Sequence, residues 1–107
     1  MPVNSRDKGK RGELELAQFL RDRGFAARRG RQYQGGQGSP DLVTNLDGIH
    51  VECKRVEAGN LYNWLAQAKA ECGWDMPVVM HRRNGEDWVA VLSLEDFLTI
   101  LKGRKST

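Results

Sequence analysis

The feature that most constrains the fold of this chain is a pair of short apolar segments joined by Asp47-Gly48. Residues 41–46 and 49–56 are rich in apolar and β-branched residues, which favour strands. Asp-Gly between two such segments is a strong signal for a two-residue β-hairpin turn. A turn of type I′ predicts that Leu46 lies opposite Ile49.

That register predicts which side chains share a face of the hairpin. Counting outward from the turn places Val43 opposite Glu52 and Asp41 opposite Lys54. Because side chains alternate along a strand, Asp41, Glu52 and Lys54 project from one face. The other face is apolar and is expected to meet the core, with Leu42, Val51 and Cys53.

The polar face of the hairpin predicts a metal site. Asp41 and Glu52 are expected to be diagonal neighbours about 7–8 Å apart at the backbone, so both carboxylates reach one ion. A hard cation such as Mg²⁺ prefers oxygen ligands, and the carbonyl of Cys53 is a further candidate. The ammonium of Lys54 could orient an attacking water or offset charge on a phosphate. The alternative is a surface hairpin with a solvated ion pair.

The remaining pattern predicts a single α/β domain over residues 1–107 with the order αβββαββα, and flexible ends at 1–7 and 103–107. Asn60 is a candidate N-cap, Ser93 with Asp96 resembles a capping box, and Gly73 ends a helix. Predicted helices run over 8–23, 60–73 and 93–103, and predicted strands over 25–29, 41–46, 49–56, 76–82 and 87–92. The glycine-rich segment 30–39 is predicted to be a loop.

Two helical residues are further candidates for the site. Glu13 precedes Leu16 and Ala17 by three and four residues and therefore shares their inward face. A glutamate there costs free energy unless it meets a cation or a donor, and the alternative is that it extends to water or pairs with a lysine. Glu15 is expected to be exposed. Gln67 could contact a water or a ligand carboxylate, or could simply be solvated.

Positive charge is concentrated at the start of the chain. Through residue 31 there are nine Lys/Arg against four Asp/Glu, and after it eight against ten, which gives +5 and −2. Such a bias fits a phosphate backbone, although a solvated basic face is an equal alternative. Candidate DNA contacts are Lys8, Lys10, Arg11, Arg28, Arg29 and Arg31. Tyr33 could stack on an unpaired base.

Several classes of protein are disfavoured. No apolar run is long enough to span a bilayer, and the polar, basic N-terminus is unlike a secretory signal. Cys53 and Cys72 lack metal-ligand spacing and are expected to be core residues in a reducing cytoplasm. His50 and His81 show no spacing typical of zinc sites, and His50 borders the polar face of the hairpin.

Taken together, these segments resemble the archaeal and phage Holliday junction resolvases. The resemblance covers about 8–101 and is carried by Gly12-Glu13, Ser39-Pro40-Asp41, Val51-Glu52-Cys53-Lys54 and the helix bearing Gln67. It implies a PD-(D/E)xK nuclease fold, with a mixed β-sheet flanked by helices, and a homodimer that cuts four-way DNA junctions. It also implies Mg²⁺ or Mn²⁺ held by Asp41, Glu52 and Glu13, a catalytic Lys54, a contribution from Ser39, and products with 5′-phosphate and 3′-hydroxyl ends.

Two other functions compete with junction resolution. One is a nicking or restriction-type nuclease on other DNA, against which the small size of the chain argues. The other is a nucleic-acid-binding module without catalysis. Two carboxylates facing phosphate would repel it unless a metal intervened, which favours the nuclease.

A symmetric dimer would supply two matched nicks to a four-way junction. Trp74, Trp88 and the apolar stripe of the last helix are candidates for its interface. Burial in the core is the default expectation for the same residues.

Overall fold

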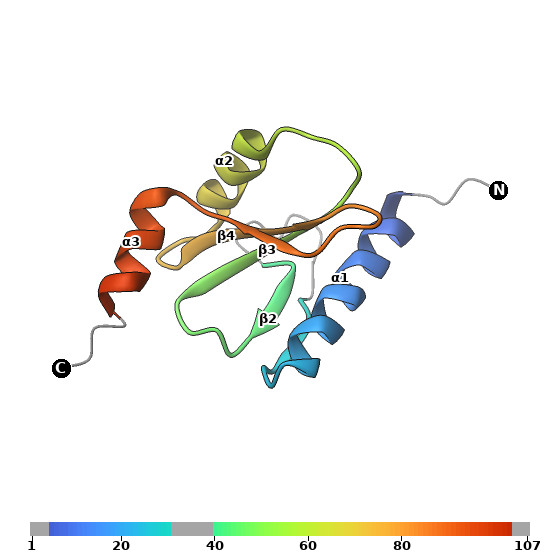
Figure 1. Cartoon of the computed structure of the whole chain (residues 1–107), viewed down its shortest axis with the longest axis horizontal. Helices are drawn as coiled ribbons and strands as arrows, with labels where there is room; N and C mark the ends of the chain where they lie inside the picture. The colour runs from blue at the N-terminus through green and yellow to red at the C-terminus, as the bar shows by residue number, and fades with distance from the viewer. Residues whose placement is uncertain (1–4, 31–39, 104–107) are drawn as a thin grey trace.

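The computed structural model describes residues 5–30 and 40–103, and it confirms the predicted element order αβββαββα (Figure 1). The described elements are α1 (Ser5–Asp22), β1 (Ala27–Arg29), β2 (Leu42–Thr44), β3 (Ile49–Arg55), α2 (Leu61–Glu71), β4 (Met76–Arg82), β5 (Val89–Val91) and α3 (Leu94–Gly103). Within these residues, none of the helices combines the length and the apolar character needed to cross a membrane.

The strands form one mixed sheet in the order β1-β2-β3-β4-β5. Neighbouring strands are antiparallel except for β3 and β4, which are parallel. Parallel neighbours need a crossover, and α2 supplies it. The predicted cap of α2 is confirmed, because Asn60 Oδ1 accepts hydrogen bonds from the amides of Tyr62 and Asn63 at 2.9 and 3.1 Å.

The predicted register of the first hairpin is wrong by two residues. Leu42 lies opposite Val51, which places Asp41 level with Glu52 instead of Lys54. Gly48 has φ 77° and no described non-glycine residue has positive φ, so the turn is not type I′, which needs positive φ at both central residues.

The slip arises in the first strand: the amide of Ile49 still bonds to the carbonyl of Leu46 at 3.1 Å, but two extra residues lie between this turn and the Leu42–Val51 pair. The amide of Asn45 bonds to the carbonyl of Ala26 and its side chain accepts from the Ala26 amide, so Asn45 pairs toward β1. Thr44 Oγ1 accepts from the amide of Leu46, so this amide bonds within its own segment rather than to β3. Because the slip is an even number of residues, every side chain stays on its predicted face.

The two faces of the sheet are covered by different helices. The face that carries Leu42 and Val51 packs against α1 through Leu16, Ala17 and Leu20. The opposite face carries Val79, which is level with Glu52 and packs against Leu65 and Ala68 of α2. Both cysteines are free and half-buried, and Cys53 packs against the α1 core. Helix α2 therefore covers the polar face of the hairpin, which was expected to be open to solvent if it carried only a surface ion pair.

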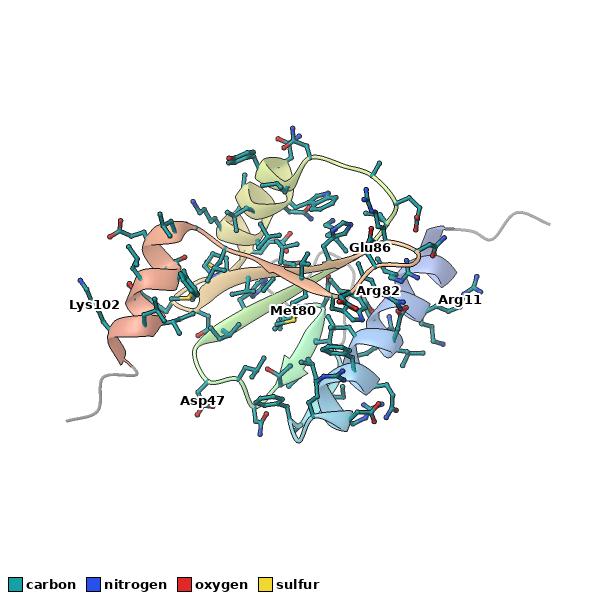
Figure 2. All side chains as sticks on the ribbon, in the orientation of Figure 1. Arg11, Asp47, Met80, Arg82, Glu86 and Lys102 are labelled. Carbon is teal, nitrogen blue, oxygen red and sulfur yellow. The ribbon has the colours of Figure 1, made fainter. Side chains whose placement is uncertain are left out.

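The last helix differs from the default expectation of a core helix. Its apolar stripe is exposed: Leu94 70%, Phe97 45%, Leu98 46% and Leu101 37%. Trp74 is also fully exposed, whereas Trp88 packs against the α1 core with its ring 6.4 Å from that of Phe19. Figure 1 shows α3 at one end of the molecule, and Figure 2 shows Lys102 on α3 at the end opposite Arg11 on α1. Burial was correctly expected for Trp88 but wrongly for Trp74 and the α3 stripe.

Candidate active site

The candidate active site centres on carboxyl groups gathered where β2 meets β3. Glu52 lies in the middle of β3, only 4% exposed, and Asp41 lies just before β2 at the same level. The last turn of α2 adds Glu71, and His50 lies two residues before Glu52 on the same face. The structure thus brings together the predicted Asp41 and Glu52, and it adds two residues that the sequence did not assign to the site.

The backbone around Asp41 holds its carboxyl group toward β3. Its amide donates to the carbonyl of Val51 at 3.0 Å, and its carbonyl accepts from the amide of Gly30 at 2.8 Å. The side chain of Asp41 extends this pairing, because its Oδ2 accepts a hydrogen bond from the amide of Cys53 at 2.8 Å, as a backbone carbonyl would in a strand. In a strand the carbonyl of a residue points to the same side as its amide, so the Cys53 carbonyl also faces the Asp41 side.

The environment of Glu52 strongly favours its neutral form when no cation is bound. Burial raises the pKa of Glu52 to about 9, and the carboxyl groups of Asp41 and Glu71 add to the shift by charge and by hydrogen bonding. His50 Nε2 lies 2.7 Å from Glu52 Oε1. Burial lowers the pKa of His50, so the imidazole offers little compensating charge. A divalent cation would supply the compensating positive charge, and the carboxylate oxygens of this cluster are ligands that suit Mg²⁺.

Glu13 approaches this cluster from α1. Its side chain is 12% exposed, and Arg29 of β1 donates to it from Nε at 2.7 Å. Burial raises the pKa of Glu13 and the charge of Asp41 raises it further, while the Arg29 hydrogen bond opposes the shift. The prediction of an inward-facing glutamate is confirmed, and its partner is an arginine rather than a lysine. Arg29, predicted to contact DNA, is thereby tied to Glu13.

Lys54 lies two residues after Glu52 and therefore shares its face of β3, where it is half-buried. It is level with His81 of β4, whose ring stacks on Trp64 of α2 at 4.8 Å. Gln67 lies on an exposed part of α2, and no contact brings it to the carboxyl cluster within the described part of the chain. Lys54 is thus on the face of β3 that carries Glu52, whereas Gln67 is exposed on α2.

The other predicted contacts are spread over the N-terminal part of the chain. Lys10 and Arg11 are exposed on α1, and Arg28 is exposed in β1. Lys8 lies in α1, and the structure describes its backbone alone. Ser39, Arg31 and Tyr33 lie outside the described residues.

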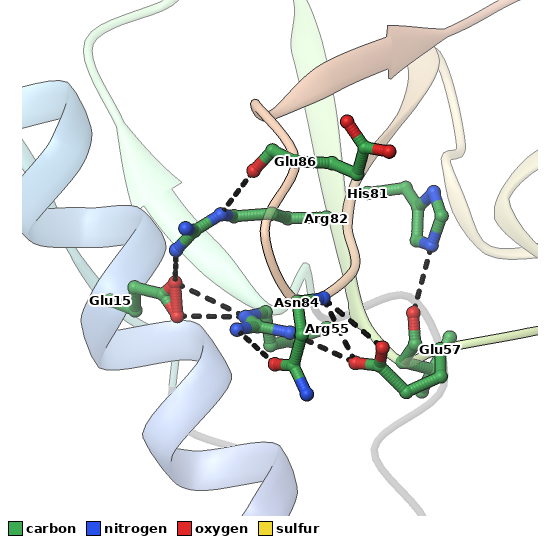
Figure 3. Close-up of polar contacts among 8 residues, drawn as sticks. Glu15, Arg55, Glu57, His81, Arg82, Asn84 and Glu86 are labelled. Carbon is green, nitrogen blue, oxygen red and sulfur yellow. Dashed lines mark hydrogen bonds and ion pairs between the residues drawn. The ribbon is translucent and has the colours of Figure 1, made fainter.

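A second polar network holds α1 against the sheet (Figure 3). Glu15, predicted to be exposed, is half-buried and accepts from Arg55 at 2.8 Å and from Arg82 at 2.6 Å. Burial raises the pKa of Glu15, but these two arginines outweigh it and leave the pKa lowered. Gly12 allows this close approach, because a Cβ there would lie 2.5 Å from Arg55 Cβ. The network fixes the helix that carries Glu13.

Comparison with known proteins identifies a family. The model of the archaeal Holliday junction resolvase (Hjc) family matches residues 4–99, which is nearly the whole chain. A search of curated proteins finds no match. The family match spans α1, all five strands and α2, and so includes every element that contributes a side chain to the carboxyl cluster.

Proposed function

We propose that this chain, which belongs to the archaeal Holliday junction resolvase (Hjc) family, is a metal-dependent endonuclease that resolves four-way DNA junctions by paired symmetric nicks. The observation that carries the proposal is the convergence of Asp41 and Glu52, with Lys54 following on the same face of β3. Burial and the neighbouring Asp41 make Glu52 costly to ionise, and a protein that only binds DNA has no use for such a carboxyl group.

Asp41 and Glu52 would hold Mg²⁺, for which Mn²⁺ could substitute, with the Cys53 carbonyl and Glu13 as further candidate ligands. When bound, the ion lowers the pKa of a water molecule and offsets negative charge on the scissile phosphate. The hydrogen bond from the Cys53 amide fixes one oxygen of Asp41. Arg29 in turn orients Glu13.

Lys54 would act on the reacting groups directly. Its ammonium can donate a hydrogen bond that orients the attacking water, and it can stabilise the negative charge that develops on the phosphate. Attack of water on phosphorus breaks the bond to the 3′-oxygen, which leaves a 5′-phosphate and a 3′-hydroxyl. No other described lysine lies on this face of β3.

The basic residues of the N-terminal part would position the DNA. Lys10 and Arg11 are exposed near the start of α1, and Arg28 is exposed in β1, so all three are open to phosphate contacts. Contacts to phosphate set affinity and orientation without reading base sequence, which suits recognition of a branched shape. Lys8, Arg31 and Tyr33 are proposed to contact DNA as well, whereas Ser39 and Gln67 are proposed to contribute to catalysis.

The second active site needed for paired nicks would come from a second copy of the chain. The exposed stripe of α3, the helix that carries Lys102, forms an apolar surface at the end of the molecule away from Arg11 (Figure 2), and Trp74 is a further exposed aromatic residue. Exposed apolar surface of this kind is typical of interfaces. We therefore assign the dimer interface to α3 and Trp74. The reaction would take place in the cytoplasm, of a prokaryotic cell or of a host cell if the protein is virus-encoded.

The test is cleavage of a labelled four-way junction beside a linear duplex of matching sequence, with Mg²⁺ and with EDTA. Paired symmetric nicks in the junction alone, lost in EDTA, are expected. Equal cutting of both substrates would replace junction resolution by a general nicking activity. Binding of the junction without cutting in Mg²⁺ would replace the enzyme by a non-catalytic binding module.

A further inference from the structure

Three side chains of the carboxyl cluster offer ligand atoms that lie close together without a contribution from Asp41. His50 Nε2, Glu52 Oε1 and a carboxylate oxygen of Glu71 all lie within 4.8 Å of one another. His50 is 3% exposed and Glu52 4% exposed, and Glu71 is half-buried. The groups come from two elements far apart in the sequence, β3 and the last turn of α2.

The surroundings of these three side chains favour a bound cation. Two carboxyl groups and an imidazole converge there, and the His50 and Glu52 side chains are almost wholly shielded from water. The C-terminal end of α2 adds the negative end of the helix dipole at the position of Glu71. The basic residue of that last turn, Lys69, is exposed. The local negative electrostatic potential would stabilise a cation bound at this point.

We propose that His50, Glu52 and Glu71 form a second cation site, selective for a first-row transition ion, which shares Glu52 with the Mg²⁺ site at Asp41. An imidazole with two carboxylates favours ions such as Mn²⁺, Co²⁺ or Zn²⁺, whereas Mg²⁺ prefers oxygen ligands alone. The ion would also tie the end of α2 to β3. The inference rests on the proposed function only in that Glu52 belongs to both sites.

Cobalt(II) is a suitable probe, because it replaces these ions and its visible absorption reports coordination. Titration by calorimetry and absorption is expected to show a Co²⁺ site that survives Asp41→Asn. Glu71→Gln and His50→Gln should each weaken it at least about tenfold, since even the loss of an outer-shell partner costs 10–100-fold. His81→Gln and Glu95→Gln, which change the other histidine and an exposed acid of α3, should leave it unchanged.

A measurement on the wild-type chain does not depend on whether the variants fold. The chain has two histidines, so NMR signals of the two rings can be assigned by comparison with His81→Gln. Sub-stoichiometric Co²⁺ is expected to shift and broaden the His50 ring signals before those of His81. Equal effects on both rings, or Glu71→Gln binding Co²⁺ as tightly as the wild type, would overturn the second site.

Failure of this site is distinguishable from failure of the nuclease assignment. A chain that cuts junctions in Mg²⁺ but binds Co²⁺ unaffected by Glu71→Gln refutes the second site and leaves the proposed function standing. A chain that binds Co²⁺ through His50 and Glu71 but cuts no DNA supports the second site and refutes the proposed function.

Discussion

Replacing Glu52 by glutamine should make the metal-free chain more stable at neutral pH. Burial, together with Asp41 and Glu71, raises the pKa of Glu52 from 4.5 to about 9. Between these values the unfolded chain loses a proton that the folded chain retains, so stability is fully present below pH 4.5 and falls as the pH rises toward 9.

The size of the effect follows from that interval. Each pH unit costs about 1.4 kcal/mol, so the loss between pH 4.5 and pH 7 is about 3 kcal/mol. Glu52→Gln keeps the size and polarity of the side chain but cannot ionise. The variant should therefore gain up to about 3 kcal/mol at pH 7, less whatever its amide loses in hydrogen bonding with His50 and Glu71.

The assay is urea unfolding in EDTA at fixed protomer concentration, from pH 5 to pH 8. The wild type should lose stability as the pH rises while Glu52→Gln changes less, and Mg²⁺ should stabilise only the wild type. Glu95→Gln, an exposed acid of α3, is the matched control and should stay within about 0.5 kcal/mol of the wild type. Equal pH slopes for the wild type and Glu52→Gln would refute the reasoning.

Three further substitutions test the packing and the interface. Gly12→Ala should destabilise the chain by about 1–3 kcal/mol in urea unfolding, because its Cβ would lie 2.5 Å from Arg55 Cβ. Gly9→Ala, whose Cβ would have nothing within 4 Å, should be neutral or stabilising. Equal effects of the two substitutions would refute the close contact. Glu15→Gln should cost about 1 kcal/mol at pH 7, discounted for partial exposure, and the difference should vanish as the pH falls below 4.5, because the pKa of Glu15 is lowered. A constant difference down to pH 3 would contradict that origin. Leu98→Glu should convert the proposed dimer to a monomer in analytical ultracentrifugation, and an unchanged mass would remove α3 from the proposed interface.

The sequence predicted the polar face of the hairpin despite a wrong register. Alternation has a period of two, so a slip of two residues left Asp41 and Glu52 on one face. The slip itself was hidden, because it depends on Asn45 pairing with Ala26, a contact 19 residues apart. Local patterns therefore fixed the face of each side chain but not its opposite neighbour.

The rest of the site depends on how α2 packs across β3. Glu71 looks like one more acid on an amphipathic helix, and only the crossover places it beside His50 and Glu52. Similarly, the partner of Glu13 comes from β1, because Arg29 lies in the strand beside it. Local helix patterns do not report which strand a helix end covers.

Exposure of α3 was equally hidden from the sequence. Its apolar stripe has the spacing of a core helix, and a helix that meets a second chain has the same pattern as one that meets its own sheet.

The most direct test of the central claim compares cutting with binding for Lys54→Ala. The claim predicts that this variant binds a four-way junction in EDTA within about threefold of the wild type, while its single-turnover cleavage rate in Mg²⁺ falls by at least about a hundredfold. Asp41→Asn should behave in the same way, and Lys69→Ala, an exposed lysine of α2, should cut normally. Near wild-type cleavage by Lys54→Ala would contradict the assignment of catalysis to this face of β3.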